Sequence, residues 1–537
     1  MSPWAEPLWS LSYLRGHGTG AERDTTLEPL QPRRQRMKAE QTGTAAEATG
    51  RTPAAAGRGA EEAGTVLPGP SLLEDPEQMR RSGYRVVDAI VDRWANLADG
   101  PAWRGASRKV TEPLLHGPPP ESGQPLEPIL ETVLQDVMPL AGRIDHPRFL
   151  AFIPSSPSWA SVLASFLVNG FNVFQGTWLE SSGPSQIEVT VTEWFREWLG
   201  YPPGAGGLFT SGGSAANLIA LVAAREAAGN PPAGTVYVSE QTHASAVRAA
   251  RIAGIDGTRV RHLPVDADFR IVPSGLREAV RRDREGGLAP FCVIANAGTT
   301  NTGAIDPLTE IAHVAKEEGL WYHIDAAYGG FAVLDPNTRP LLAGLELGDS
   351  VSLDPHKWFF QPYETGCLMV RDVTRLEAAF RMLPEYLQDA DWGPEHVNFC
   401  DRGLQLTRSF RALRVWLAVQ RYGLDAHRTE IARAIGLARR TEARIRAEAE
   451  LELLSPQSLG VVCFRYVGRP AAAPRSLDEL NREIQDRITR SGLAMLSSTR
   501  LGRRFSLRFC ILNTRTTAAD VDLALDAILR TGRELDA

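Results

Sequence analysis

From about residue 147 onward, short apolar segments alternate with segments whose apolar residues recur at helical spacing. The apolar segments at 235–238, 291–295 and 321–324 have no polar face, and helical patterns at 244–253 and 308–317 lie between them. A strand that is apolar on both faces must be covered on both sides, and parallel strands need crossover connections that are usually helical. The alternation therefore predicts an α/β fold with a mainly parallel sheet. Ligands of such sheets bind at the carboxyl ends of the strands.

The rest of the chain divides by composition. Residues 1–70 are rich in Ala, Gly, Thr, Glu and Arg with little apolar periodicity, which predicts a disordered extension. We expect an N-terminal helical segment over 71–145, a large ligand-binding domain over 146–422 and a smaller α+β domain over 423–537. Within the helical segment, amphipathic patterns cover 84–94 and 126–140.

Composition limits the function. The 537 residues are 43% hydrophobic and 23% charged, which is typical of a globular protein large enough to bury a sizeable site. The net charge of -6 and the absence of a dense basic stripe argue against nucleic acid or an anionic membrane as partner, and favour a small-molecule substrate. The five cysteines are odd in number and widely spaced, which predicts reduced thiols in a cytoplasmic protein.

One lysine is conspicuous because lysine is rare here. The chain has four lysines among 58 basic residues, and one of them, Lys357, lies in an Asp-Pro-His-Lys-Trp stretch at 354–358. Arginine supplies positive charge equally well, but only lysine can lose its proton and act as an amine nucleophile. Lys357 is therefore a candidate for amine chemistry, whereas the remaining three have neighbours that suggest ordinary surface positions.

A glycine- and hydroxyl-rich turn at 207–217 runs directly into a helical pattern. Backbone N–H groups at a helix start, with no side chains at Gly212 and Gly213 and a hydroxyl at Ser214, would form a phosphate cradle. Alone, a Gly-Gly-Ser sequence before a helix is more often an ordinary turn and helix cap. It lacks the Gly-Lys-Ser/Thr ending of a nucleoside-triphosphate loop.

Two further residues follow predicted strands. Asp325 ends the segment at 321–324 and precedes the small residue Ala327, so its buried carboxylate could pair with a protonated pyridine nitrogen and leave room for a flat ring. His243 follows the strand at 235–238, where an imidazole can cap a helix or stack on an aromatic ring. Together with Lys357 and the phosphate cradle, these residues describe a site for pyridoxal 5′-phosphate.

The stretches at 354–358, 323–328 and 210–214 resemble the signatures of the group II pyridoxal-phosphate-dependent amino-acid decarboxylases. The resemblance implies a type I aminotransferase-like fold with a seven-stranded large domain, and a homodimer with sites at the interface. It also implies that Lys357 forms the internal aldimine, that Asp325 pairs with the pyridine nitrogen, and that Ala327 and His243 sandwich the ring. The residues implied at the phosphate region are Gly213, Ser214, Thr300 and His356.

Within this family the aromatic-L-amino-acid decarboxylases are most similar. Residues 146–155 resemble their substrate-side segment, so Phe152, Ile153 and Ser155 would line the pocket for the substrate ring. Residues 383–387 resemble their mobile catalytic loop, in which Tyr386 would be the proton donor. The chain departs from the family pattern at two positions, with Asp354 where Asn is common and Thr407 where a smaller residue often lies.

The expected reaction is decarboxylation of an aromatic L-amino acid (the tyrosine, tryptophan, phenylalanine or DOPA type) to its amine and carbon dioxide, through an external aldimine and a quinonoid. An oxidative aldehyde synthase is an alternative, although such relatives commonly replace the loop tyrosine or the stacking histidine, and Tyr386 and His243 are present here. Decarboxylation of glutamate or 2,4-diaminobutyrate is another, which should require charged residues where Phe152 and Ile153 lie. A catalytically silent scaffold is the fourth.

Overall fold

The computed structural model describes residues 72–382, 385, 389, 392–393, 395–468 and 476–536. Its strands in chain order are β1 (Gly206–Thr210), β2 (Gly234–Ser239), β3 (Val260–Leu263), β4 (Ala289–Asn296), β5 (Trp321–Asp325), β6 (Ser350–Leu353), β7 (Gly366–Val370), β8 (Leu451–Leu453), β9 (Val461–Tyr466), β10 (Ser497–Leu501) and β11 (Arg504–Cys510). Its α-helices are α1 (Pro76–Ala95), α2 (Arg108–Leu115), α3 (Leu126–Thr132), α4 (Trp159–Gly170), α5 (Ser182–Leu199), α6 (Gly213–Ala227), α7 (Ala244–Ile252), α8 (Pro273–Glu285), α9 (Leu308–Glu317), α10 (Thr374–Phe380), α11 (Ala412–Ala447), α12 (Leu477–Arg490) and α13 (Ala518–Asp536).

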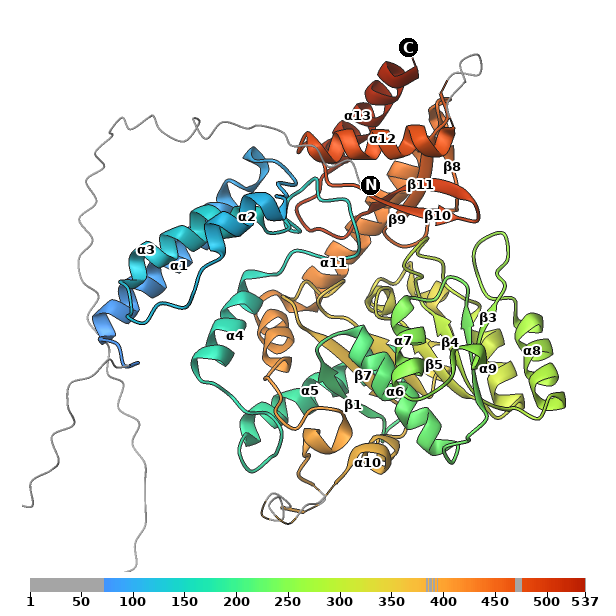
Figure 1. Cartoon of the computed structure of the whole chain (residues 1–537). Helices are drawn as coiled ribbons and strands as arrows, with labels where there is room; N and C mark the ends of the chain where they lie inside the picture. Colours follow the sequence, from blue (N-terminus) through green and yellow to red (C-terminus); the bar gives the residue numbers. More distant parts are fainter. Residues whose placement is uncertain are drawn as a thin grey trace, which may run out of the picture. The chain divides into compact units, whose positions relative to one another are not determined.

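The larger sheet has seven strands among the described residues, in the order β1-β7-β6-β5-β4-β2-β3 (Figure 1). Strands β6, β5, β4, β2 and β3 pair in parallel, and β7 runs antiparallel to both of its neighbours, β1 and β6. The sheet is therefore mainly parallel, as the alternation of strands and helices predicts. Every strand except β7 ends at the same edge of the sheet.

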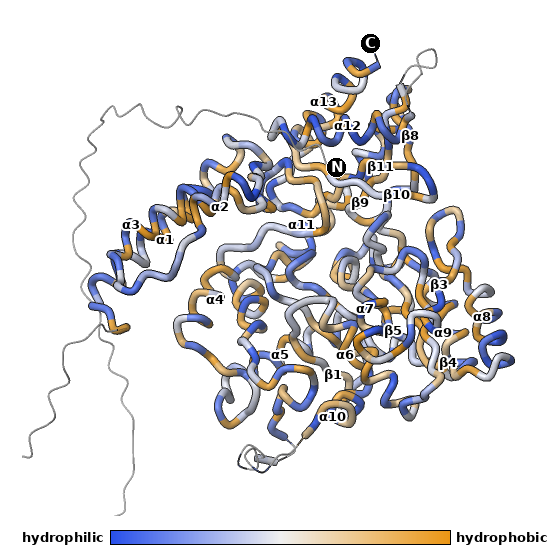
Figure 2. The backbone as a smooth tube through the Cα atoms, viewed as in Figure 1, coloured by the Kyte–Doolittle hydropathy of each residue, from blue (hydrophilic) through white to orange (hydrophobic). Residues whose placement is uncertain are grey.

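Helices cover both faces of this sheet. Successive strand residues pack into different apolar clusters, one on each face. Val236 and Val238 of β2 pack with residues of α6 and α7, whereas Tyr237 between them packs with residues of α8 and α9. All six residues of β2 are buried. In Figure 2 the outer helix α8 is mostly hydrophilic while β4 beside it is mostly hydrophobic. A strand buried on both faces reads as a continuous apolar run, which is why these strands are visible in the sequence.

A second sheet, formed near the C-terminus, has four antiparallel strands in the order β10-β11-β9-β8. Helices α12 and α13 pack on it around a separate apolar cluster that contains Phe464 and Phe509, whose ring centroids are 5.0 Å apart. The preceding helix α11 is interrupted at Gly423, whose φ of 73° lies in the left-handed region. The division of the chain into domains at 145/146 and 422/423 stays a prediction.

The helices before residue 145 are largely exposed. None of the described residues of α1, α2 and α3 is buried. An ion pair of 2.8 Å between Arg85 and Glu131 links α1 to α3. Asp75 caps α1 by accepting hydrogen bonds from the backbone N–H groups of Glu77 and Gln78, and for this reason the helix begins well before the predicted 84–94.

The helix predicted over 126–140 is regular only as far as Thr132. It continues as a π-helical turn over Val133–Val137 and a 3₁₀ turn over Met138–Leu140. Pro139 contributes no backbone N–H, so the α-helical hydrogen-bond pattern cannot continue through it.

Candidate active site

A cavity of about 330 Å³ lies where the strands of the large sheet end. Segments that follow β1, β2, β4, β5 and β6 all contribute to its wall, as expected for a ligand site on a parallel sheet. Its lining residues are Ser211, Gly212, Gly213, Ser214, Asn217, His243, Ser245, Asn296, Gly298, Thr300, Asp325, Ala327, Tyr328, Asp354, His356 and Lys357.

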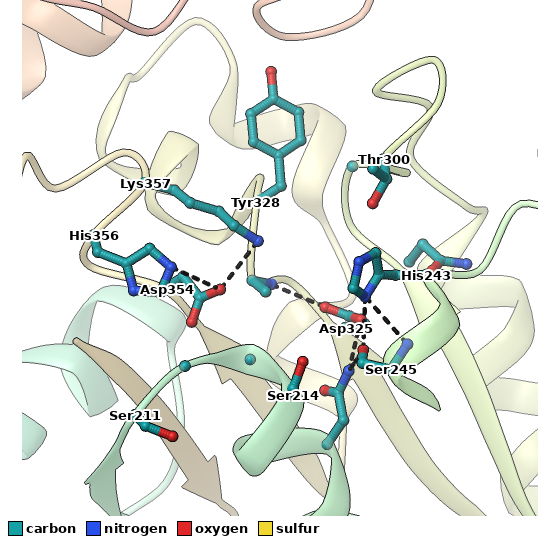
Figure 3. Close-up of a pocket in the computed structure, with 16 residues that line it drawn as sticks. Ser211, Ser214, His243, Ser245, Thr300, Asp325, Tyr328, Asp354, His356 and Lys357 are labelled. Atoms are coloured by element: carbon teal, nitrogen blue, oxygen red, sulfur yellow. Dashed lines mark hydrogen bonds and ion pairs between the residues drawn. The ribbon is translucent and has the colours of Figure 1, made fainter. Parts of the chain in front are cut away.

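The amine of Lys357 faces this cavity together with the carboxylate of Asp325 (Figure 3). Lys357 Nζ lies 3.0 Å from Asp354 Oδ2, and His356 Nε2 lies 3.6 Å from the same oxygen. The Lys357 side chain is 23% exposed, so the amine can be reached by a small molecule that enters the cavity. The structure thus brings together the two residues on which the sequence prediction most depends.

Asp325 is held by neutral donors. Asn217 Nδ2 donates to its Oδ2 at 2.8 Å, while Ser352 Oγ and the Ala327 backbone N–H both donate to Oδ1 at 3.2 Å. The residue is 7% exposed, and none of its hydrogen-bond partners in the described part of the chain carries a positive charge. A buried carboxylate without a cation is prepared to receive one from a ligand.

A polarised hydrogen-bond chain runs behind Asp325. Asn217 turns its Oδ1 toward His323 Nε2, so the single ring proton of neutral His323 lies on Nε2. The Ser350 hydroxyl, which accepts from Trp321 Nε1 at 2.9 Å, therefore donates to His323 Nδ1 at 2.8 Å. His323 Nε2 then donates to Asn217 Oδ1 at 3.0 Å, which leaves the Asn217 amide N–H groups for Asp325. Burial lowers the pKa of His323 to about 4, so the imidazole is neutral. These hydrogen bonds fix the orientation of the Asn217 side-chain amide, so that its N–H groups donate toward Asp325.

The same amide orients His243 through Ser245. Asn217 Nδ2 donates to Ser245 Oγ at 3.0 Å, and Ser245 in turn donates from its hydroxyl and from its backbone N–H to His243 Nδ1. Because Nδ1 accepts, the proton of the neutral ring lies on Nε2. Partial burial lowers the pKa of His243, so this neutral form predominates at neutral pH.

The glycine turn lies at the start of the 15-residue helix α6. A Cβ at Gly213 would lie 2.9 Å from Ala327 Cβ and 3.0 Å from Asp354 Oδ2, so no larger residue fits there. Ser214, in the first turn of α6, is exposed to the cavity. Backbone N–H groups at a helix start have no partner within the helix, so this turn and the Ser214 hydroxyl have the geometry of an anion cradle.

Thr300 lies on the loop after β4, and strands of the second sheet hold this loop. Arg508 of β11 donates to the Thr300 carbonyl at 2.7 Å, and Thr499 of β10 donates to Asn301 Oδ1 at 2.8 Å. Arg508 is 5% exposed and also contacts Ser497 Oγ at 3.3 Å. The second sheet therefore fixes one wall of the cavity.

His356 is oriented by the backbone that follows it. Its Nδ1 donates to the Thr365 carbonyl at 2.7 Å, which leaves Nε2 toward Asp354. Burial lowers the pKa of His356, and the positive charge of Lys357 acts in the same direction.

Most of the predicted site residues meet at the cavity, three of the described ones do not, and one is not described. Lys357, Asp325, Ala327, His243, Gly213, Ser214, Thr300 and His356 all line it. Ser155 lies just behind, where its Oγ donates to the His356 carbonyl at 3.3 Å. Phe152 and Ile153 are not among the lining residues, and Phe152 is 56% exposed. Tyr386 lies outside the residues that the structure describes.

Three functional candidates escaped the sequence analysis. Asn217 is one helical turn after Gly213, so a helical wheel would have placed it toward the cavity. Ser245 is two residues after His243, which caps helix α7, and a cap side chain contacts the second or third residue of its helix. Asp354 drew attention only as a departure from a family pattern. Its buried Oδ1 has no hydrogen-bond partner among the described residues.

These features fit pyridoxal 5′-phosphate. Its phosphate fits the glycine turn, where a Cβ on Gly213 would leave no room. Its ring nitrogen fits the Asp325 carboxylate, which has only neutral hydrogen-bond partners among the described residues, and its aldehyde fits the accessible amine of Lys357. Within the described residues, no group of three or more His, Cys, Asp or Glu side chains could hold a metal ion, and no helix is long and apolar enough to cross a membrane. The five cysteines are free, and burial raises the pKa of each thiol.

Comparison with known proteins decides the family. The model of the pyridoxal-dependent decarboxylase conserved domain matches residues 110–467. The chain belongs to the pyridoxal-dependent decarboxylase family. It is 40% identical over 454 residues to an aromatic-L-amino-acid decarboxylase of Bacillus atrophaeus, a match that covers 84% of this chain and 95% of that one. The predicted cofactor, pyridoxal 5′-phosphate, and the predicted enzyme class, an amino-acid decarboxylase, are confirmed.

Solved structures of the family share the fold. An Oryza sativa TDC with PLP and tryptamine has a TM-score of 0.83 and 31% identity, and the match covers 86% of this chain and 99% of that one. A Rhodiola rosea 4-hydroxyphenylacetaldehyde synthase has a TM-score of 0.80 and 29% identity, with 86% and 99% covered. The predicted fold class is confirmed.

Proposed function

We propose that this decarboxylase acts on an aromatic L-amino acid of the tyrosine, tryptophan, phenylalanine or DOPA type, and releases the amine and carbon dioxide. The observation that carries the proposal is the single cavity shared by the Lys357 amine, the Asp325 carboxylate and the glycine cradle. The aromatic preference is supported by the relative from Bacillus atrophaeus and by the tryptamine named with the Oryza sativa structure.

When bound, pyridoxal 5′-phosphate supplies an electron sink for the bond that breaks at the substrate's Cα. In our proposal Lys357 holds the cofactor through its amine, and Asp325 keeps a proton on the ring nitrogen. The neutral donors around Asp325 suit this role, because they orient the carboxylate without neutralising it. Phosphate would be bound by Gly213, Ser214, Thr300 and His356 around the start of α6.

His243 and Ala327 would lie on opposite faces of the cofactor ring. His243 suits a protonated ring because it is neutral, and a cation stacked there would repel it. Its Nε2 proton is available to a group in the cavity, since Nδ1 is occupied by Ser245. Ala327 lies beside the glycine turn and leaves room for a flat ring. Tyr386, on the loop at 383–387, is proposed as the proton donor to the substrate carbon on the family resemblance.

We also propose that the enzyme is a homodimer in the cytoplasm. The described part of α1, α2 and α3 buries no residue, although these helices carry apolar side chains that would be covered in an assembly. Phe152 is also exposed, so a second chain could place it in a shared substrate pocket. Large exposed apolar residues in this half of the chain include Met79, Tyr84, Val91, Phe152, Phe166 and Phe171. The five free cysteines suit a reducing compartment. Light scattering coupled to gel filtration would report a dimer mass, and a monomer would refute this assembly.

The test of the activity uses the purified holoenzyme and a panel of amino acids, with products identified by mass spectrometry. We expect amine and carbon dioxide from aromatic substrates and little turnover of glutamate or 2,4-diaminobutyrate. Release of aldehyde, ammonia and peroxide would instead identify an aldehyde synthase. Lys357→Ala should abolish both turnover and the absorbance band near the visible edge that the lysine-bound cofactor gives. Retention of that band would contradict the role of Lys357.

A further inference from the structure

Asp354 follows β6 and lies between the reactive lysine and the glycine turn (Figure 3). Its side chain is 3% exposed. Oδ2 lies 3.0 Å from Lys357 Nζ, whereas the buried Oδ1 has no hydrogen-bond partner among the described residues. A buried carboxylate oxygen is almost always hydrogen-bonded. The carboxyl group is therefore incompletely bonded in the cofactor-free protein. Because Oδ1 is enclosed by protein atoms and Asp354 lines the cavity, Oδ2 is the oxygen that a ligand can reach.

The carboxyl group borders the space proposed for the phosphate. A Cβ at Gly212 would lie 3.9 Å from Asp354 Oδ1, and one at Gly213 would lie 3.0 Å from Oδ2. A phosphate at the start of α6 would thus lie beside a buried carboxylate. Two anions in such a place repel each other strongly unless a proton lies between them.

A proton is present at this point of the cavity. Lys357 must lose its ammonium proton before its nitrogen can attack the carbonyl carbon of the cofactor. Asp354 Oδ2, at 3.0 Å from Nζ, is in hydrogen-bond contact with it. In such a transfer an N–H bond of the ammonium breaks and an O–H bond of the carboxyl group forms, with no oxidant or reductant involved.

We propose that Asp354 takes the ammonium proton of Lys357 when the cofactor binds and, as a carboxylic acid, donates it in a hydrogen bond to the phosphate. The inference rests on the proposed function only for the position of the phosphate. One residue thereby frees the amine and removes its own negative charge from beside the incoming anion. It changes from the counter-ion of Lys357 in the cofactor-free enzyme to a phosphate ligand in the holoenzyme.

His356 is the competing site for this proton. Its Nε2 lies 3.6 Å from Asp354 Oδ2, but burial lowers the pKa of the ring and so disfavours the imidazolium form. The other groups around the carboxyl group have no proton to exchange near neutral pH, because burial raises the pKa of both the phenol and the thiol and lowers that of the imidazole. Among the described residues, the titratable groups that interact electrostatically with Asp354 are Lys357, His356, His243, Tyr363 and Cys367.

The test compares the wild-type protein with Asp354→Asn, whose amide can donate to phosphate without taking up a proton. Cofactor-free protein is titrated with pyridoxal 5′-phosphate by calorimetry in two buffers of different ionisation enthalpy, which gives the number of protons exchanged. We expect Asp354→Asn to release about one proton more than the wild type, since its Lys357 proton must go to solvent. Asp354→Ser, which removes the acid altogether, serves as a second variant and should show the same excess.

Pyridoxal, which lacks the phosphate, is the matched ligand. With it the excess should fall below about half a proton, because nothing then holds the proton on Asp354. Equal proton counts for wild type and both variants with pyridoxal 5′-phosphate would overturn the proposal, and so would an undiminished excess with pyridoxal. Borohydride reduction followed by peptide mass spectrometry checks the proposed function separately. If Lys357 is unlabelled in the wild type, the proposed function fails rather than the role of Asp354.

Discussion

Two carboxylate–cation pairs near the glycine turn are built in opposite ways. Arg408 and Glu188 are 1% and 0% exposed, and Arg408 Nη2 donates to Glu188 Oε1 at 2.6 Å. The backbone N–H of Phe209 also donates to that carboxylate, and Arg408 donates to the carbonyls of Gln175 and Phe209. The pair of Lys357 and Asp354 is instead joined through a single carboxylate oxygen, with the second oxygen unpartnered in the described part of the chain.

The two ion pairs therefore suit different tasks: the pair of Arg408 and Glu188 stabilises the structure, whereas the pair of Lys357 and Asp354 can react. Every carboxylate oxygen of Glu188 is bonded, so the pair with Arg408 fastens the end of β1, from which the glycine turn emerges. When both oxygens of the carboxylate already accept hydrogen bonds, exchanging a partner adds no new bond. Lys357 and Asp354 lie in a cavity with bonding capacity to spare, which an arriving cofactor can use.

Breaking the fully bonded pair should have the largest effect. Arg408→Met leaves Glu188 as a buried charge without its cation, so we expect the free energy of unfolding to fall by about 3–5 kcal/mol. Lys357→Met also leaves a buried carboxylate without its cation, but Asp354 lines a cavity, so we expect a smaller loss, of about 1–2 kcal/mol. Denaturant unfolding of the cofactor-free proteins measures both. Similar losses for the two variants would erase the distinction between these pairs.

The charge on Asp325 should matter for rate rather than for folding. Asp325→Asn keeps the shape of the side chain but removes the anion proposed to face the ring nitrogen, and we expect decarboxylation to slow by about 10²- to 10³-fold. The fold should persist, because the amide oxygen of the variant side chain can still accept from Ser352 and from the Ala327 backbone, so that only the contact with Asn217 Nδ2 is lost. Initial rates at saturating cofactor measure the effect. The exposed Asp268 provides a control, since Asp268→Asn should leave the rate unchanged.

The hydrogen-bond chain behind Asp325 should make stability depend on pH. His323 has a pKa of about 4 in the folded protein and an ordinary value near 6.5 when unfolded, so the unfolded state binds more protons between these values. The stabilising contribution is fully present above pH 6.5 and is lost as pH falls toward 4, by up to about 3 kcal/mol. His323→Gln should flatten this part of the profile. Unfolding of both proteins from pH 4 to 7 measures the slope, and parallel profiles would contradict the assignment.

Much of this arrangement could be predicted from sequence because strand ends converge. Once 235–238, 291–295 and 321–324 are recognised as parallel strands, His243 and Asp325 must approach one edge of the sheet, and the motif at 354–358 joins them. The prediction of one helix over 126–140 was wrong beyond Thr132. The apolar spacing of this segment is helical, but Pro139 cannot continue an α-helix.

Contacts between residues that are far apart in the sequence could not be predicted in this way. His323 and Ser350 are directly opposite each other only because of the register between β5 and β6, which no local pattern encodes. Phe152 is exposed in the single chain, and its predicted place in the substrate pocket depends on the homodimer that we propose.

Arg508 should behave like Arg408, as a residue that fixes the site from outside the cavity, but with a smaller effect. It donates to the Thr300 carbonyl from the second sheet, and Arg508→Lys cannot keep that contact and the one to Ser497 together. Losing a hydrogen bond of this kind costs about 1 kcal/mol, so we expect cofactor affinity to fall about fivefold while the rate at saturating cofactor is retained. Fluorescence titration with pyridoxal 5′-phosphate measures the affinity. Arg504→Lys on the same strand, where the arginine pairs with Glu452 at 3.0 Å, is the matched control and should leave the affinity unchanged. A lower rate at full cofactor occupancy for Arg508→Lys would place it with the reacting residues and not with Arg408.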